Sequence, residues 1–175
     1  MTEPEFNRIV TRYGNRVYGY VVYYLGSSNQ ANDVLQEVFI RLWKRRKEVE
    51  PDRVLSWLLT VARNACIDEH RKNKNRISRM TTDTEIVEAA LDGGGRSPSE
   101  ITESTMMMED IQNAVDKLED PYRSIVILRE MQGFKYEEIS DALELPLSTV
   151  KVYLHRARKK LRHQLMDKLE LRHVG

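Results

Sequence analysis

The strongest chemical signal in the sequence is a row of cationic side chains near its C-terminal end. No acidic residue occurs between Ser148 and Gln164. Like charges on adjacent turns of a helix repel by roughly a few tenths of a kcal/mol per pair, so a polyanion is their natural partner. A basic face that is merely solvated is the alternative interpretation. The row consists of Lys151, His155, Arg158 and Arg162, and Val152, Arg156 and Lys159 form the row beside it.

The elements around this row favour the nucleic-acid interpretation. A short helix is predicted from Tyr136, followed by a tight connection over 144–147 and a long final helix with Ser148 as its N-cap. A short helix, a tight turn and a longer basic helix form the helix-turn-helix order, in which the first residues of the second helix reach base edges of duplex DNA. The apolar positions expected to be buried on the opposite face are Val150, Leu154, Ala157 and Leu161.

Residue patterns typical of catalysis or metal binding are absent from the sequence. His70, His155, His163 and His173 have no metal-ligand spacing with Cys66, and there is no paired-cysteine or His-Glu-x-x-His motif. A lone cysteine within a predicted helix is expected to be a small buried residue rather than a nucleophile. The sequence therefore predicts no enzymatic activity, no metal and no cofactor.

Length and composition favour a helical protein of one ordinary domain or two small ones. The chain has 175 residues, with 28 Lys and Arg against 27 Asp and Glu. It contains only 8 Gly and 5 Pro, which is few for a strand-rich protein with many turns. Its longest apolar run, 17–25, is too short to span a bilayer, and no cleavable apolar leader is recognised. A single cysteine cannot form an internal disulfide. Together these features predict a cytoplasmic protein without membrane insertion.

Apolar periodicity predicts three helices in the first part of the chain. The first carries Phe6 to Tyr24 at spacings of three and four, and the second follows 26–29 with Ser28 or Asn29 as its N-cap. Pro51 marks a break, and a third helix is expected from about Val54 to Arg71. The last segment restarts with apolar periodicity over 111–118, and the next helix, with Asp120 as N-cap and Pro121 as first residue, is expected to end at Gly133.

Charge divides the chain into three segments. Residues 1–77 carry a net charge of +5, 78–110 carry −6 and 111–175 carry +2. The acidic middle contains the Gly- and Ser-rich run 92–99, which is typical of a flexible linker. The predicted fold is therefore all-α, with two small helical domains at 1–77 and 106–175 joined by a flexible linker at 78–105, the C-terminal one being a helix-turn-helix.

The first half has a second candidate surface, in which aromatic and basic side chains are interleaved. Trp43, Trp57 and Asn64 are surrounded in sequence by the basic run 44–47 and by further cations up to Arg76. Rings beside cations suit single strands, whose bases stack on aromatic side chains or enter a pocket. Burial of both tryptophans in the core, with charges that only solubilise the surface, is the alternative.

Three segments in the right order resemble the extracytoplasmic-function (ECF) group of bacterial RNA polymerase sigma factors. They are 33–43 (DVLQEVFIRLW), 56–68 (SWLLTVARNACID), and 136–139 (YEEI) with 148–158 (STVKVYLHRAR). The resemblance covers nearly the whole chain. It implies a protein without enzymatic activity that binds core RNA polymerase, recognises the minus-ten and minus-thirty-five promoter elements and promotes promoter melting.

The resemblance assigns roles to residues of the first half. It implies that the loop 44–53 receives a flipped base, although 48–52 here lacks the aromatic-Arg-Gly sequence of other members. Asp33, Gln36 and Glu37 would face the clamp helices of the polymerase's largest catalytic subunit, a simply solvated helix face being the alternative. Asn64, Asp68 and Arg71 would read the minus-ten element as non-template single strand.

In the second half the resemblance implies contacts with the minus-thirty-five duplex. Lys135 stands where Thr is a common N-cap, so a weaker start of that helix is expected. An anti-sigma protein that clamps both halves is a further implied partner. The alternative is a helix-turn-helix regulator that binds DNA as a dimer without polymerase. The implied duplex contacts are Ser148, Thr149, Lys151, Val152, His155 and Arg156, with Arg158 and Lys159 better placed for phosphates.

Overall fold

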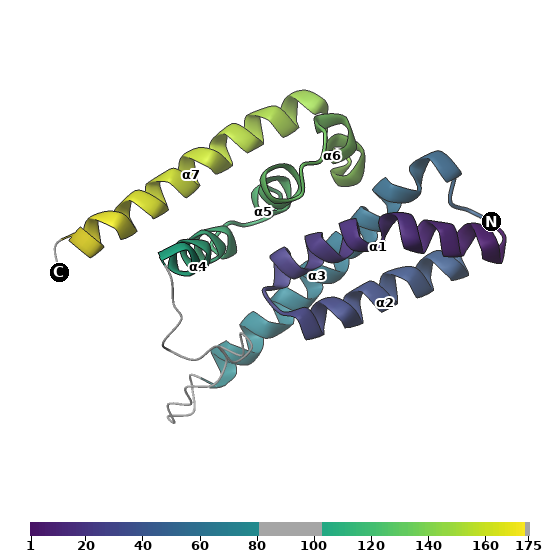
Figure 1. The fold of residues 1–175 in the computed structure, drawn as a ribbon, viewed down its shortest axis with the longest axis horizontal. Coiled ribbons are helices and arrows are strands. Elements are labelled where there is room, and N and C mark those ends of the chain that lie inside the picture. The colour runs from purple at the N-terminus through teal and green to yellow at the C-terminus, as the bar shows by residue number, and fades with distance from the viewer. Residues whose placement is uncertain (81–102, 174–175) are drawn as a thin grey trace. The chain divides into compact units, whose positions relative to one another are not determined.

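A computed structural model describes residues 1–80 and 103–173, and all its elements within these ranges are helical (Figure 1). The chain divides into two compact units, Met1–Arg96 and Ser97–Gly175. The prediction of an all-α fold with two small domains is thereby confirmed. Most of the predicted linker, 81–102, lies outside the described residues, and the exact domain bounds stay a prediction.

The first unit is built from three long helices that pack pairwise (Figure 1). They are α1 (Glu3–Leu25), α2 (Ser28–Lys44) and α3 (Val54–Met80), and a short 3-10 turn, η1 (Pro51–Arg53), leads into α3. Cys66 is fully buried between them, as expected for a small apolar residue. The core also contains Val17, Tyr20, Val21, Tyr24, Ala31, Val34, Val38, Leu42, Val54, Leu58, Leu59 and Ala62.

Two helix ends of the first unit differ from the sequence-based prediction. Ser27, rather than Ser28 or Asn29, is the N-cap of α2, and its Oγ accepts a hydrogen bond from the Gln30 N–H at 3.4 Å. Helix α3 continues to Met80, beyond the predicted end near Arg71. The basic run that follows Arg71 contains no Gly or Pro, and Lys and Arg are good helix formers, so nothing stops the helix there.

The second unit contains the predicted helix-turn-helix. Helices α4 (Glu103–Asp116) and α5 (Tyr122–Val126), the latter continued by a π-helical turn η3 (Ile127–Met131), precede α6 (Tyr136–Leu143) and the long α7 (Leu147–His173). Helix α7 packs against α4, α5 and α6. Buried side chains include Ala114, Val115, Leu118, Ile125, Val126, Ile127, Leu128, Phe134, Ile139, Ala142, Leu143, Val150, Leu154 and Ala157.

Helix boundaries in this unit agree with the sequence to within two residues. Gly133 adopts a left-handed conformation (φ 68°) after η3, which confirms the predicted stop. The N-cap of α5 is Pro121 instead of Asp120, whose Oδ1 accepts a hydrogen bond from the Ser124 hydroxyl at 2.8 Å. Ser148 lies inside α7 instead of at its N-cap, because Pro146 O already accepts the Val150 N–H at 3.0 Å.

The apolar side chains of α7 become less buried towards its C-terminal end. Val150, Leu154 and Ala157 are buried as predicted, but Leu161 is half-buried. Helix α6 has eight residues, about 12 Å, so it covers only the first turns of the much longer α7. The first turns are thus the part of α7 that the helix-turn-helix holds firmly.

A buried cation joins α4 to α5. The Arg123 side chain is 3% exposed, and its Nη2 lies 2.7 Å from the Asp116 carboxylate. A buried guanidinium needs such a partner, because the desolvation of an unpaired charge costs several kcal/mol. The pair therefore fixes the helix that supports α7.

Candidate nucleic-acid interface

The first turns of α7 present one exposed polar face. Seven of the eight predicted duplex contacts are exposed, and Thr149 is half-buried. Val152 is 46% exposed, an apolar contact surface among cations that suits the methyl group of thymine. Because the buried side of α7 packs on the rest of the unit, these side chains share the outward side. They are Ser148, Lys151, Val152, His155, Arg156, Arg158 and Lys159.

Tyr136, the first residue of α6, lies between two cations. The guanidinium carbon of Arg129 is 4.6 Å from the centre of its ring, and Lys151 Nζ is 5.8 Å from the same point. Both distances fall within the range of cation–π attraction. The Tyr136 ring thus helps to orient Lys151, a role that the sequence analysis did not assign because the two residues are on different helices.

The start of α6 is held by its own third helical residue. The Lys135 backbone N–H donates to the Glu138 carboxylate at 2.8 Å. Lys135 makes no side-chain cap, as its chemistry requires. Glu138 compensates for part of the missing cap, and the expected weakness of this helix start stays a prediction.

Arg158 already has an acidic partner. Its Nε and Nη2 lie 3.0 and 2.5 Å from Glu130 Oε1, on η3. Both side chains are about half exposed, and exposed pairs of this kind contribute only about 0–1 kcal/mol. A DNA phosphate can therefore replace Glu130 at little cost. The sequence analysis missed this pair, since its members are 28 positions apart and carry no local signal.

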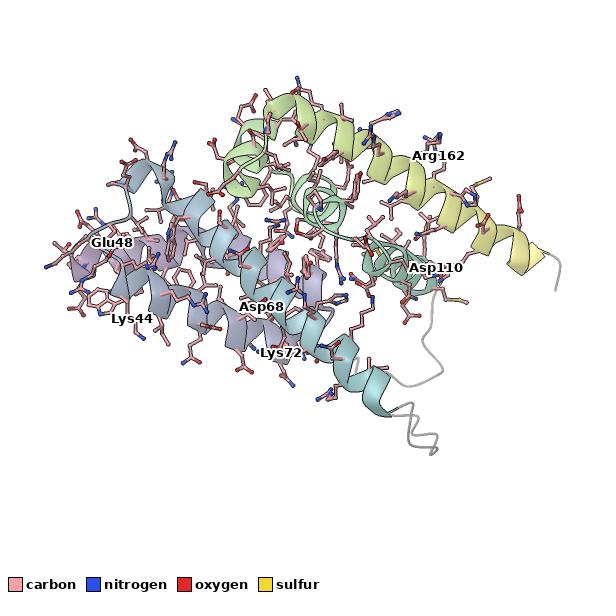
Figure 2. All side chains as sticks on the ribbon, turned by 180° about the vertical axis from the view of Figure 1, so that it is seen from behind. Lys44, Glu48, Asp68, Lys72, Asp110 and Arg162 are labelled. Atoms are coloured by element: carbon pink, nitrogen blue, oxygen red, sulfur yellow. The ribbon has the colours of Figure 1, made fainter. Side chains whose placement is uncertain are left out.

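In the first unit, the predicted single-strand contacts lie along one face of α3. Asn64, Asp68 and Arg71 are all exposed and follow one another at spacings of four and three. Figure 2 shows Asp68 and Lys72 on successive turns of this helix. Residues at such spacings share a helix face. The structure thus brings these three polar side chains to one side of α3.

The turn after α2 encloses a hollow at the start of α3. Figure 2 shows Lys44 and Glu48 at this end of the unit. The hollow has a volume of about 300 Å³ and combines the Trp57 ring with two cations and two carboxylates. Arg53 Nε lies 4.0 Å from Glu50 Oε2. An aromatic ring beside donors and acceptors is what a flipped base needs. The lining residues are Arg45, Glu48, Val49, Glu50, Arg53 and Trp57.

Neither tryptophan belongs to the buried core. Trp43 is 37% exposed, with the Arg46 guanidinium carbon 4.3 Å from the centre of its ring and the Phe6 ring edge-on at 5.1 Å. Trp57 is half-buried. The alternative of two core tryptophans is therefore wrong for Trp43, which is accessible on the surface.

Helix α2 presents a separate polar row. Asp33, Gln36 and Glu37 are exposed, and Glu37 forms an ion pair with Arg41. Ile40, one turn further, is 46% exposed. Polar and acidic residues beside an exposed aliphatic side chain are typical of a protein interface with a polar rim.

Residues 1–80 and 103–173 contain neither a candidate metal centre nor a candidate membrane span. In this part of the chain there is no group of three or more His, Cys, Asp and Glu side chains that could hold a metal ion. None of the helices described is long and apolar enough to cross a bilayer.

Family models match both units. The model of sigma-70 region 2 matches residues 9–76, and that of sigma-70 region 4 matches residues 108–161.

Two curated relatives are similar along almost the whole chain. The ECF RNA polymerase sigma factor SigW of Bacillus subtilis is 32% identical over 170 residues, covering 94% of this chain and 91% of SigW. The ECF RNA polymerase sigma factor SigE of Mycolicibacterium smegmatis is 29% identical over 163 residues, covering 93% of this chain. The matched part spans 62% of the length of SigE.

Two solved structures share the fold. CnrH, in complex with the cytosolic domain of CnrY, superposes with a TM-score of 0.68 at 18% identity, covering 95% of this chain and 90% of that one. The sigma factor RpoE of Bartonella quintana, in complex with the anti-sigma factor NepR, gives 0.66 at 20% identity, with coverages of 93% and 97%.

Proposed function

The chain belongs to the ECF family of RNA polymerase sigma factors, and we propose on this basis that it binds core RNA polymerase and directs it to promoters. It acts in transcription initiation through two DNA-binding surfaces, one on each unit. The order of the two matched regions along the chain is the observation that carries this conclusion. Such a factor contributes binding and positioning, and no catalytic role is proposed for any of its residues.

The α7 face reads the minus-thirty-five element as duplex. Ser148 and Thr149 lie at the start of the helix, where backbone N–H groups and hydroxyls favour a phosphate. Arg158 and Lys159 bind neighbouring phosphates of the DNA backbone. Arg158 exchanges its ion pair with Glu130 for one of these phosphates. The contacts with base edges thus determine which sequence is bound, and the contacts with phosphates position α7 along the duplex. The base-reading residues are Lys151, Val152, His155 and Arg156.

The α3 face and the hollow at Trp57 read the minus-ten element as single strand. Asn64 offers both a donor and an acceptor to a Watson-Crick edge, which is accessible only after the base pair opens. The hollow, about 300 Å³, takes one base that has left the stack. Asp68 and Arg71 extend the contact along α3. Recognition and melting thus share one cause, since the strand is bound only in its opened form.

The α2 row binds core polymerase. Asp33, Gln36 and Glu37 supply charge complementarity to a basic partner surface, and Ile40 adds exposed apolar area. The α2 row shares no residue with the proposed DNA contacts on α3 and α7, so polymerase and promoter use different residues of the chain.

An anti-sigma protein restrains this factor when it is not needed. Of the two solved structures named above, that of the sigma factor RpoE is a complex with the anti-sigma factor NepR. The factor itself works in the bacterial cytoplasm, and a membrane-bound anti-sigma partner would hold it at the membrane.

A promoter-opening assay with purified core polymerase tests this function. Core plus the chain is expected to make thymines near the start site reactive to permanganate, whereas core alone does not. Tight and specific binding of the chain alone to a symmetric duplex site, with no opening in the presence of core, would instead support a dimeric helix-turn-helix regulator.

A further inference from the structure

A larger groove borders the same turn on the side of α1. It has a volume of about 470 Å³ and lies between the first half of α1 and the segment that follows α2. Four cationic side chains line it: Arg8 and Arg12 from α1, and Arg46 and Lys47 from the turn. We call it the α1 groove. None of the contacts proposed above uses it.

The charge of the α1 groove is strongly positive. Glu5 is the acidic residue among those that line it, and its carboxylate already accepts the Thr2 N–H at 2.6 Å. This hydrogen bond lowers the pKa of Glu5 by stabilising its ionised carboxylate. Four cationic side chains against one carboxylate leave a net side-chain charge of about +3, which attracts a polyanion.

One of the four cations is held in position by its surroundings. Arg46 Nη1 donates to Trp43 O at 2.8 Å, and its guanidinium stacks on the Trp43 ring. A guanidinium carries five donors, so this arrangement fixes the group while donors remain for a phosphate. The Arg46 guanidinium is thus already positioned to bind an anion in the groove.

The α1 groove adjoins the hollow at Trp57. Val49 lines both, so the turn separates two neighbouring depressions in the same unit. The remaining lining is suited to a base as well as to a phosphate, because Ile9, Tyr13 and Pro51 add apolar and aromatic surface. Aromatic and aliphatic surface beside cations is the composition of single-strand channels.

We propose that the α1 groove binds the nucleotide next to the flipped base, through its phosphodiester group and one face of its base. The inference rests on the proposed function, because it needs a base in the hollow at Trp57. An acidic polypeptide would satisfy the cations, but it would not account for the shared boundary at Val49 or for the ring of Tyr13. A melted strand that crosses the turn accounts for both.

Single-stranded oligonucleotides of stepped length test the proposal. Two shortened probes carry part of the non-template minus-ten sequence of a promoter that the complex of core polymerase and this chain opens, and one ends at its 3′ side, the other at its 5′ side, with the base that enters the hollow at Trp57. That base is located beforehand by 2-aminopurine fluorescence. Each probe is extended past it by two nucleotides, or by two abasic units, and its affinity for the complex is measured by fluorescence anisotropy at several salt concentrations.

One of the two extensions is expected to raise the affinity of the probe. Each of the variants Arg8→Ala and Arg12→Ala is then expected to lower the affinity for that extended probe roughly three- to fivefold. Each alanine variant is also expected to make the dependence on salt weaker. The slope of the logarithm of the association constant against the logarithm of the salt concentration should become less negative by about 0.7. Arg8→Lys and Arg12→Lys should keep most of the gain. Arg16→Ala is the matched control, since Arg16 lies one turn further along α1 and does not line the groove.

The other outcomes are distinct. If neither extension raises the affinity, or if the gain survives in both alanine variants, the α1 groove does not bind the strand. If these variants weaken core binding while the gain is unchanged, a protein partner occupies the groove and the proposal is overturned. If even a probe with the complete minus-ten sequence fails to bind, the proposed function itself is wrong.

Discussion

Replacing Arg156 by alanine separates base reading from every other role of α7. Arg156 is exposed on the outward face of α7, whereas Arg158 on the same face is paired with Glu130. The substitution removes no buried contact, and alanine favours the helix, so the free energy of unfolding should change by less than about 0.5 kcal/mol. Any larger effect on promoter binding then reflects the DNA contact.

The expected loss follows from the geometry of one base contact. A guanidinium that binds a guanine edge through two hydrogen bonds contributes about 1–3 kcal/mol of discrimination. This corresponds to a roughly 5- to 150-fold weaker preference for the cognate base pair. Phosphate contacts of the neighbouring cations are unaffected, so binding to promoters that already carry the wrong base pair should hardly change.

The assay measures competition among promoter variants for the complex of core polymerase and this chain. Each variant carries one substitution in the upstream element, and salt is held fixed because phosphate contacts depend on it. Arg162→Ala is the control, since Arg162 is exposed six residues further along α7 (Figure 2). Loss of affinity that is equal for all promoter variants would place Arg156 on a phosphate and refute the reasoning.

Three further substitutions test other parts of the account. Asn64→Ala should slow promoter opening, followed by permanganate reactivity, while core binding is unchanged; loss of core binding would mean that α3 faces the polymerase. Glu37→Lys should weaken core binding severalfold in a pull-down titration, and unchanged binding would exclude this face of α2. Asp116→Asn leaves the buried Arg123 without a full countercharge and should lower the free energy of unfolding by about 1–3 kcal/mol in urea; an unchanged transition would show that other groups satisfy this arginine.

Helix positions were predictable because they depend on local periodicity. The spacing of Val17, Tyr20, Val21 and Tyr24 identifies a buried stripe, and all four side chains are buried. Helix ends were less predictable, since Ser27 and Ser28 are chemically equal candidates for one cap. The end of α3 shows the same limit, because the run after Arg71 lacks the apolar periodicity of a packed helix as well as the Gly or Pro that would mark where the helix stops.

Surfaces assembled from distant segments could not be predicted from the sequence. The α1 groove combines Arg8 with Arg46, and the Arg158 pair depends on Glu130, so each requires the packing of separate elements. By contrast, the α7 face was predictable, because all its residues lie on one helix and recur at helical spacing. The position of Tyr136 beside Lys151 is intermediate, since the helix-turn-helix order predicts that these helices meet but not which side chains touch.

Mapping transcript start sites tests the central claim most directly. Genomic fragments of the source organism are transcribed by purified core polymerase with and without this chain, and the 5′ ends are sequenced. The account predicts new, precisely defined starts that appear only with the chain and share sequence elements near minus ten and minus thirty-five. Identical start sites in both reactions would contradict it.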